Sequence, residues 1–464
     1  MIDFYAVSVL IFVIILAVIV YRDRKKFTRD SIFLLRKTQT GRKFLTNLSD
    51  RFPRFWKHVG TIGVVVSLIG SLYGFVLLLN LFVKSIFAER AVGGMAVLLP
   101  TPTASPIIAP GVLGVPFWYW IISIALLVVV HEGSHGIQAI RAKVPIKSLG
   151  WGILLIIPLA FVEPDEKMLQ KKKSLHQLRV FGAGSFANFV LAGVILVILA
   201  VVSSNIMVAS GVQYYGLIQN YSAFENNMTG KIVSLNGIPV MDDRDLSEAL
   251  EITGVGRKVQ VVTFNGTTES TYEIETRKPP EYEYVPNFDE NVMIGMEHLI
   301  PGITDVSESF GKSLNAIGGA ETYDSWSSLS MQITKWEYIR ENYPALRQRS
   351  DSKLRELNVK LLERSEPGYI GIYGVSVDYE VIDSLKPYEE PVLFTNGLLF
   401  FVFLINLGVG IANMLPVKPL DGGRMWEIIF RRFSKRHYKT MTKALGYITF
   451  FLIIAAFAMP FIKP

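Results

Sequence analysis

The sequence contains no cysteine and only six histidines among its 464 residues. The lack of cysteine excludes disulfide scaffolds and thiolate-bound metals. Any zinc ion would therefore be held by histidine and carboxylate side chains, the usual ligands of catalytic zinc sites. Because histidine is so scarce, a pair at helical spacing is more informative here than it would be in a histidine-rich chain.

Long polar stretches are also scarce. Half of the residues are hydrophobic and the mean hydropathy is +0.35, which is too apolar for an ordinary soluble protein. We predict a polytopic α-helical membrane protein with about six spans. The apolar runs that predict these spans lie at about 4–21, 59–83, 116–136, 180–203, 391–413 and 444–461. Four glycines of the second run suit close helix contacts: Gly60, Gly63, Gly70 and Gly74.

Basic residues are concentrated in three segments between the predicted spans. Residues 22–57 carry twelve Lys/Arg and three acids, residues 141–179 carry eight and three, and residues 424–443 carry seven and one. Residues 204–390 carry 16 Lys/Arg and 29 Asp/Glu. Alternating spans place the basic segments on one side, which the positive-inside rule identifies as the cytosol. We therefore expect a multi-pass protein of the cell membrane whose loop 204–390 is extracytosolic.

The first part of this loop, residues 204–280, has the pattern of a small α+β domain. Asn236-Gly237 is a hairpin-turn signal between two apolar strands within residues 231–240. A short helix signature at 245–251 follows, and then a predicted strand at 258–264. This order resembles a PDZ domain of the protease-associated type, although another small mixed domain would also fit. PDZ domains bind an extended peptide at a sheet edge, often by its C-terminal carboxylate.

Residues 281–390 have a less defined pattern and an uncertain fold. They predict one amphipathic helix at about 335–364 and a strand in the Gly-Tyr-Ile-Gly-Ile-Tyr-Gly-Val run at 368–375. The sequence leaves open whether this region is a second domain or an elaboration of the first. The proline-rich residues 85–115 predict a non-helical outer loop. The chain thus divides into five predicted parts: residues 1–84, 85–203, 204–280, 281–390 and 391–464.

The third predicted span ends in His131-Glu-Gly-Ser-His135. On a helix these histidines share one face, where one Zn²⁺ ion can bind both. Glu132 lies beside them, placed to take a proton from a water molecule at the metal. The alternative is a helix end with two capping or surface histidines, but polar groups at membrane depth are expensive and usually functional. A zinc hydrolase motif in a membrane segment predicts peptide-bond hydrolysis within or beside the bilayer.

A third ligand is predicted at the end of the fifth span. Pro416 and Pro419 interrupt the helix there, and Asp421 follows them before two glycines. A carboxylate on irregular backbone in a membrane requires a cavity or a metal. A zinc ion held by the two histidines would account for Asp421. Taken alone, an interfacial turn with an exposed aspartate would explain it as well.

Together these motifs resemble the site-2 protease family of intramembrane zinc metalloproteases. The matching elements are His131-Glu-Gly-Ser-His135, the pattern Asn413…Pro416…Pro419-Leu-Asp421-Gly, and Phe161-Val-Glu-Pro-Asp-Glu166 followed by a basic segment and Gly184-Ser-Phe-Ala-Asn-Phe189. The family commonly has proline where this chain has Ser185. The resemblance covers residues 116–203 and 391–430, while the first two spans and residues 281–390 lie outside it.

The resemblance implies one Zn²⁺ ion per chain, with a fourth position for water and three protein ligands: His131, His135 and Asp421. It implies Glu132 as the general base and later as the proton donor to the leaving amine. Asn413 would hydrogen-bond the substrate near the scissile carbonyl, and Asn188 would shape the cavity or bridge two helices. The implied substrates are single-span membrane proteins, cut in their transmembrane segments after a first cut has shortened the outer domain.

Residues 146–164 are short and rich in glycine and isoleucine, and they predict a membrane-dipping hairpin near the site. A transmembrane helix hides its peptide bonds in internal hydrogen bonds, so a substrate must unwind before it is cut. We hypothesise that a strand that includes Gly152 and Ile153 pairs with the unwound substrate. The predicted topology places the site near the cytosolic ends of its spans, where water has easiest access.

Two other functions fit parts of the sequence. In a different class of membrane zinc protease, a downstream glutamate would be the third ligand, but the best-placed carboxylate here is Asp421. In a non-enzymatic receptor or chaperone, the PDZ-like domain would be the active part and Glu132 would not be needed. Basic clusters on the predicted cytosolic face most simply set topology and contact anionic lipid headgroups. We therefore expect the lipid bilayer, and no nucleic acid, among the partners.

Overall fold

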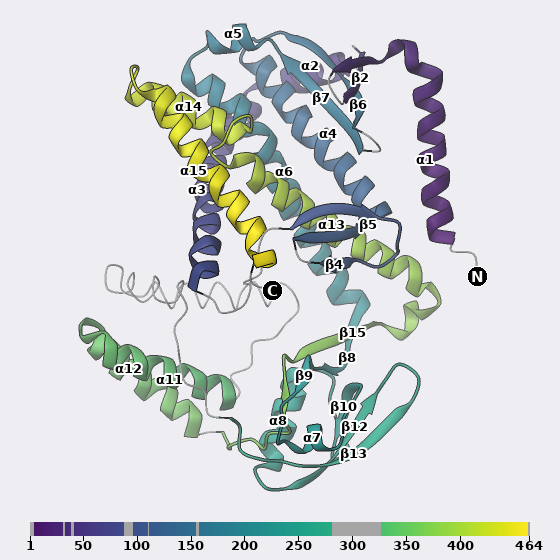
Figure 1. The fold of residues 1–464 in the computed structure, drawn as a ribbon, viewed down its shortest axis with the longest axis vertical. Helices are drawn as coiled ribbons and strands as arrows, with labels where there is room; N and C mark the ends of the chain where they lie inside the picture. The colour runs from purple at the N-terminus through teal and green to yellow at the C-terminus, as the bar shows by residue number, and fades with distance from the viewer. Residues whose placement is uncertain are drawn as a thin grey trace. The chain divides into compact units, whose positions relative to one another are not determined.

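The computed structural model describes residues 4–30, 33–38, 41–87, 96–109, 111–154, 157–280, 326–362 and 364–462. The chain divides into two compact units. The first comprises Met1–Leu199 and Phe394–Pro464, and the second comprises Ala200–Leu393. Figure 1 follows the chain from its N-terminus to its C-terminus.

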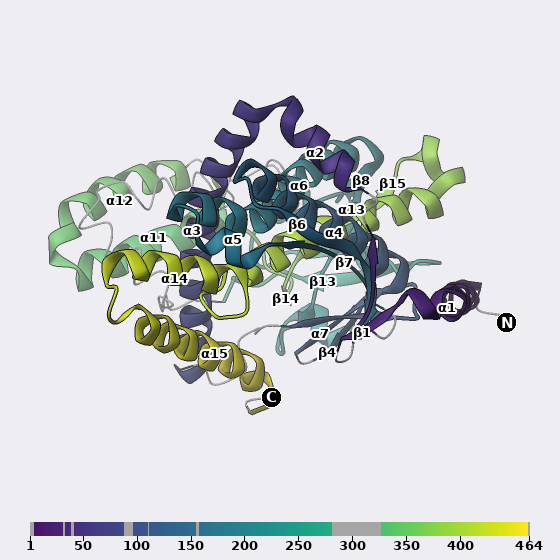
Figure 2. The ribbon, with the colours of Figure 1, turned by 90° about the horizontal axis from the view of Figure 1, so that it is seen from above.

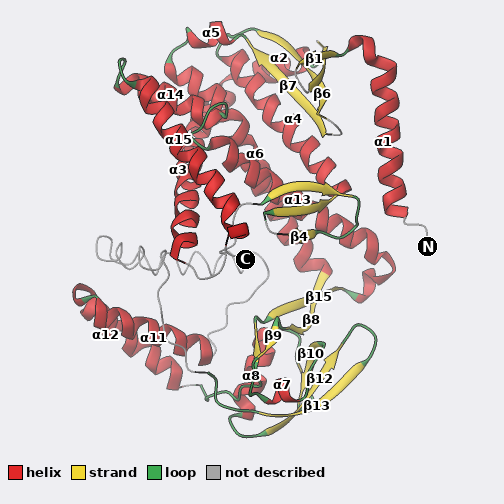
Figure 3. Cartoon of the chain, in the orientation of Figure 1, coloured by secondary structure: helices red, strands yellow, loops and turns green. Residues whose placement is uncertain are grey.

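Six helices of the described chain are long and apolar enough to cross a membrane, which confirms the predicted number. Figure 3 shows them among the red helices. They are α1 (Phe4–Asp23), α3 (Pro53–Phe87), α4 (Phe117–Arg141), α6 (Ser174–Ile206), α13 (Glu389–Met414) and α15 (Tyr438–Ile462). Most extend beyond the predicted apolar runs, because polar turns continue the helix at their ends. Leu10, Ile14 and Val18 of α1 each expose more than half of their surface, as expected of a helix that faces lipid.

The glycines of α3 allow neighbouring helices to approach closely, as predicted. An added Cβ at Gly60 would lie 2.5 Å from the Gln138 side chain of α4, and one at Gly63 would lie 3.1 Å from Phe186 of α6. At Gly74 it would lie 2.9 Å from Ile411 of α13. Small residues in one helix thus hold three other helices of the first unit in place.

A four-stranded antiparallel sheet lies against α4 (Figure 2). In order, its strands are β1 (Thr28–Asp30), β2 (Phe33–Thr38), β6 (Ile146–Leu154) and β7 (Ile157–Pro164). β6 and β7 confirm the predicted hairpin. β1 and β2 come from the segment 22–57, where the sequence predicts only a loop. Gly150 permits this pairing, because a Cβ there would collide with the Arg36 carbonyl of β2.

Strands also form in the predicted outer loop. They are β3 (Val97–Thr101), β4 (Ile107–Ala109) and β5 (Val112–Pro116), in the order β3-β5-β4. Val115 of β5 is fully buried with Phe117 and Trp120 of α4. The described part of this loop is therefore mostly non-helical, as predicted, and its last strand anchors the start of α4.

The second unit is built on a six-stranded sheet with the main path β13-β12-β10-β8-β15, and β11 pairs with β10. Its strands are β8 (Met207–Gln213), β10 (Lys231–Leu235), β11 (Ile238–Pro239), β12 (Lys258–Phe264), β13 (Glu269–Glu275) and β15 (Ser376–Val381). Asn236 and Gly237 have φ angles of 50° and 76°, which confirms the predicted hairpin turn. The predicted short helix is α8 (Asp243–Thr253), whose N-cap is Asp242.

Part of the predicted region 281–390 returns to this sheet. β15 pairs with β8 of this sheet, while β14 (Ile372–Tyr373) pairs with β9 (Gly216–Leu217) in a separate two-stranded sheet. Lys231 of β10 also bonds Asp378 and Glu380 of β15, at 2.8 and 2.7 Å. This part is therefore an elaboration of the sheet domain, a question that the sequence leaves open.

The single helix predicted at 335–364 is wrong. α11 (Trp326–Asn342) and α12 (Arg347–Leu362) form a hairpin with a short 3₁₀ turn at Pro344–Leu346. Pro344 cannot continue the hydrogen-bonding of α11 and restricts the residue before it. Residues 281–325 of the predicted region lie outside the described residues.

Candidate metal centre

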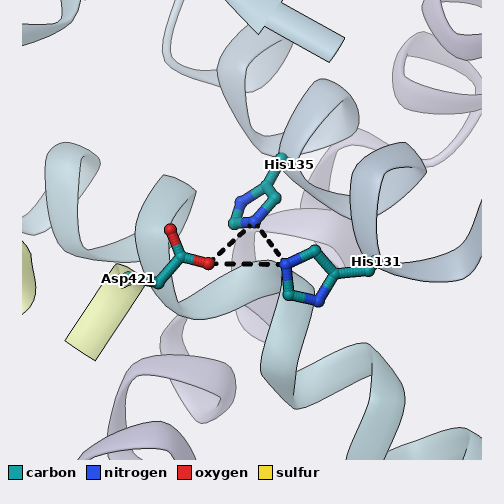
Figure 4. Close-up of side chains that lie close together, drawn as sticks. All are labelled: His131, His135 and Asp421. Atoms are coloured by element: carbon teal, nitrogen blue, oxygen red, sulfur yellow. Dashed lines mark hydrogen bonds and ion pairs between the residues drawn. The ribbon is translucent and has the colours of Figure 1, made fainter. Parts of the chain in front are cut away.

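α4 places His131 and His135 at one position in the first unit. Both side chains are buried, and their Nε2 atoms lie 3.1 Å apart. The four-residue spacing returns both imidazoles to one face of the helix, as the sequence predicts. Figure 4 shows the two rings converging with the Asp421 carboxylate.

Asp421 reaches the histidines from the start of α14 (Asp421–Phe433). Its Oδ2 atom lies 3.0 Å from His135 Nε2 and 3.5 Å from His131 Nε2. Gly422 and Gly423 permit this position, because a Cβ at either would collide with the backbone of residues 414–418. Burial opposes ionisation of the Asp421 carboxyl, but the adjacent histidines outweigh it and hold its pKa below the usual value.

The three side chains fit a zinc ion. Zinc–ligand distances of about 2.0–2.2 Å in a tetrahedral site put neighbouring ligand atoms about 3.4 Å apart. The three separations of 3.0, 3.1 and 3.5 Å bracket this value. Two imidazoles and one carboxylate form the donor set of catalytic zinc sites, which keep a further position open.

Hydrogen bonds at the Nδ1 atoms orient both imidazoles. His135 Nδ1 lies 2.6 Å from the Val180 carbonyl, so it donates there and leaves the Nε2 lone pair directed at the centre. Asn188 is fully buried, with Nδ2 3.1 Å from His131 Nδ1 and with Oδ1 unpaired among the described residues. A half-turn of the amide lets Oδ1 accept the Nδ1 proton of His131. His131 Nε2 is then also free for a metal.

Gly184 of α6 leaves the space that a metal needs. An added Cβ there would lie 2.5 Å from His135 Nε2 and 2.6 Å from His131 Nε2. The sequence comparison with the site-2 protease family includes Gly184 in a motif but gives it no role. The sequence feature that could have revealed this role is the position of Gly184, four residues before Asn188. That spacing places both residues on the same face of the helix.

Glu132 faces an edge of the four-stranded sheet. The Val162 N–H of β7 donates to Glu132 Oε2 at 2.9 Å. Alternate residues of a strand direct their N–H groups to the same side, so the N–H groups of Val162 and Ala160 both point away from β6. In the sheet as described, β7 is an outer strand and this is its open side. Side-chain patterns carry no signal for such a backbone contact, and the sequence analysis missed it.

A pocket of about 1120 Å³ opens at the metal centre. Asn413, near the end of α13, lines it together with Glu132 and the three candidate ligands. Gly152 and Ile153 lie instead in β6, which is paired with β2 on one side and β7 on the other. Among the described residues, the open backbone edge of the hairpin therefore lies on β7 and not on β6.

Comparisons with known proteins bear on this site. A family model described as Peptidase family M50 matches residues 119–456, a span that includes all three candidate ligands. The chain is also 30% identical over 187 residues to the uncharacterized protein MJ0971 of Methanocaldococcus jannaschii. That alignment covers 39% of this chain and 48% of the relative. The chain thus spans about half the length of the relative that it matches.

Proposed function

Because the chain belongs to peptidase family M50, the site-2 protease family of membrane-embedded metalloproteases, we propose that it is an intramembrane zinc metalloendopeptidase. Its substrates in this proposal are single-span membrane proteins, cut in their transmembrane segments after a first cut outside. The observation that carries the proposal is the convergence of His131, His135 and Asp421 beside Glu132. The six candidate spans around this cluster support cleavage in the bilayer.

Each polar residue at the centre has one task in this proposal. His131, His135 and Asp421 hold one Zn²⁺ ion, which when bound supplies Lewis-acid polarisation of a carbonyl and makes water more acidic. Glu132 takes a proton from the attacking water and later delivers it to the leaving amine nitrogen. Asn413 hydrogen-bonds the scissile carbonyl oxygen as negative charge develops on it.

β7 positions the substrate. An unwound transmembrane segment exposes backbone groups that must find partners in the bilayer, and the outward N–H and C=O groups of β7 supply them. We expect Ala160→Pro, which removes one outward N–H, to slow cleavage while zinc stays bound. Ala160→Gly keeps that N–H and is the matched control. Equal cleavage by both variants would remove β7 from the proposal.

Charge and predicted topology place the other parts of the chain relative to the membrane in this proposal. The basic segments 22–57, 141–179 and 424–443 lie at the cytosolic face, which puts the metal centre near the cytosol. The loop 204–390 is then extracytosolic. Its sheet domain acts as a PDZ-like module that binds a peptide or a newly made C-terminus, and the strands β14 and β15 belong to it.

The test uses the full chain in liposomes with a single-span model substrate. We expect the wild type to cut, Glu132→Gln to cut about 10²–10⁴-fold more slowly, and the chelator-treated wild type not to cut. Cleavage by Glu132→Gln at the wild-type rate would contradict the role of Glu132. A zinc-loaded wild type that cuts no transmembrane substrate would favour a receptor or chaperone built on the PDZ-like module.

A further inference from the structure

A second pocket in the first unit is lined by basic side chains. Its volume is about 370 Å³, and it lies where α3 and α6 begin and α4 ends. Arg54 and Lys57 come from the first turns of α3, Arg141 from the last turn of α4, and Arg179 from the second turn of α6. His176 and Gln138 also line it. We call this the basic pocket.

Arg179 is the least accessible of these cations. It is only 9% exposed, and its Nη2 donates to Thr61 Oγ1 at 2.8 Å. Its Nε is buried and has no hydrogen-bond partner among the residues that the structure describes. The guanidinium therefore carries a donor that this part of the chain leaves unused.

Acidic residues do not balance the basic pocket. Arg141 pairs with Asp50 at 2.9 Å. Within the described ranges, no carboxylate forms an ion pair with Arg54, Lys57 or Arg179. The N-terminal ends of the two long helices α3 and α6 add partial positive charge at this position. The pocket thus concentrates positive charge around an arginine that cannot lose its proton.

A buried and uncompensated charge is costly, since removing a charge from water is repaid only by a partner of opposite sign. The missing partner is an anion. A guanidinium supplies a planar fork of donors and an ammonium adds a point charge, the combination that binds phosphate oxygens. We propose that the basic pocket is a binding site for a phosphate-bearing anion, either a lipid headgroup or a soluble phosphate.

The test measures thermal unfolding of the full chain, so it does not depend on the proposed protease activity. In detergent, inorganic phosphate is titrated at constant ionic strength against chloride. We expect the wild type to gain several degrees in Tm. Arg179→Met should lose this gain and should match or exceed the wild-type Tm without phosphate, because a buried unpaired charge is gone.

Two further variants keep the test decisive. Lys57→Gln retains Arg179 and is expected to bind phosphate about tenfold more weakly or worse, the cost of one hydrogen bond to a charged group. Arg436→Gln removes an exposed cation outside the basic pocket and should behave as the wild type. If Arg179→Met does not fold, the phosphate affinity of Lys57→Gln is the deciding measurement. Equal gains in Tm from phosphate in the wild type and all variants would overturn the proposal.

A second arm separates the two sources of phosphate. The same proteins are placed in nanodiscs of phosphatidylcholine, with or without phosphatidylglycerol, and in phosphatidylcholine nanodiscs with inorganic phosphate. Stabilisation by phosphatidylglycerol that depends on Arg179 identifies a headgroup site. Stabilisation by inorganic phosphate alone identifies a soluble anion. A wild type that responds to neither, in nanodiscs or in detergent, would overturn the proposal.

Discussion

The candidate metal centre and the basic pocket are two polar sites of the same unit, and they present opposite kinds of groups. At the metal centre, lone pairs of His131, His135 and Asp421 converge within 4.8 Å of one another. At the basic pocket, four cationic side chains line the space, and Arg179 is one of them. The first arrangement suits a cation and the second suits an anion. One site gathers lone pairs and the other gathers cationic side chains. The kind of group that gathers at a site therefore indicates the class of ligand that the site suits.

The largest expected effect follows from removing the one charged ligand of the metal centre. Asp421→Asn should lose bound zinc and all measurable cleavage, because two imidazoles alone leave the ion underligated. Glu132→Gln should keep its zinc and lose cleavage by about 10²–10⁴-fold. Metal analysis and cleavage are measured on the same samples. Full zinc content in Asp421→Asn would show that the Asp421 carboxylate is not needed to bind zinc, which would contradict the proposed metal centre.

A matched pair of glycines in α6 tests the space for the metal. In Gly184→Ala the new Cβ falls 2.5 Å from His135 Nε2, so the imidazoles must turn away. We expect zinc binding to fall at least about tenfold, as it does when ligand orientation is lost, while the helix remains folded. Gly193→Ala is the control, because its Cβ would meet nothing within 4 Å. If both variants bind zinc like the wild type, the centre lies elsewhere.

Asn188 tests the orientation of His131. Asn188→Ala removes the partner of Nδ1 and is expected to weaken zinc binding or cleavage by about 10–100-fold. Asn406→Ala provides the comparison, since Asn406 is equally buried but bonds the Val402 carbonyl of its own helix. Both variants should lose stability, and only Asn188→Ala should lose zinc affinity. Equal losses of zinc affinity in the two variants would show that Asn188 contributes only through packing.

The smallest effect concerns a carboxylate at the rim of the large pocket. The Ser148 hydroxyl donates to Glu163 at 2.5 Å, and this bond, with Lys37, holds the Glu163 pKa below its ordinary value of 4.5. A carboxyl group with a lowered pKa stabilises the folded protein at pH values above its ordinary pKa. This stabilisation is lost as the pH falls through the lowered pKa. Ser148→Ala should therefore cost at most about 1 kcal/mol at neutral pH, since Glu163 is half exposed, and less in acid. Thermal unfolding at both pH values measures this, and an equal cost at both would contradict it.

Sequence patterns predicted many features that depend on residues close in the chain, although they missed the break at Pro344 between α11 and α12. The spans follow from local hydropathy, and the histidine pair follows from helical spacing. Asp421 was found because two prolines and two glycines mark an unusual helix junction. The pairing of β2 with β6 was not foreseen, because it joins segments that are more than a hundred residues apart and leaves no local pattern. The burial of Arg179 was missed for the same reason, since it depends on where three helices meet.

The split of the ligand set has a consequence for how the protein is made. α4 carries two of the candidate ligands and α14 carries the third, and the whole second unit lies between them in the chain. Synthesis proceeds from the N-terminus, so the nascent chain holds both histidines long before it holds the carboxylate. The metal centre is complete only after the second unit and α14 have been made. Translation order alone thus keeps the third candidate ligand away from the other two until most of the chain has been made.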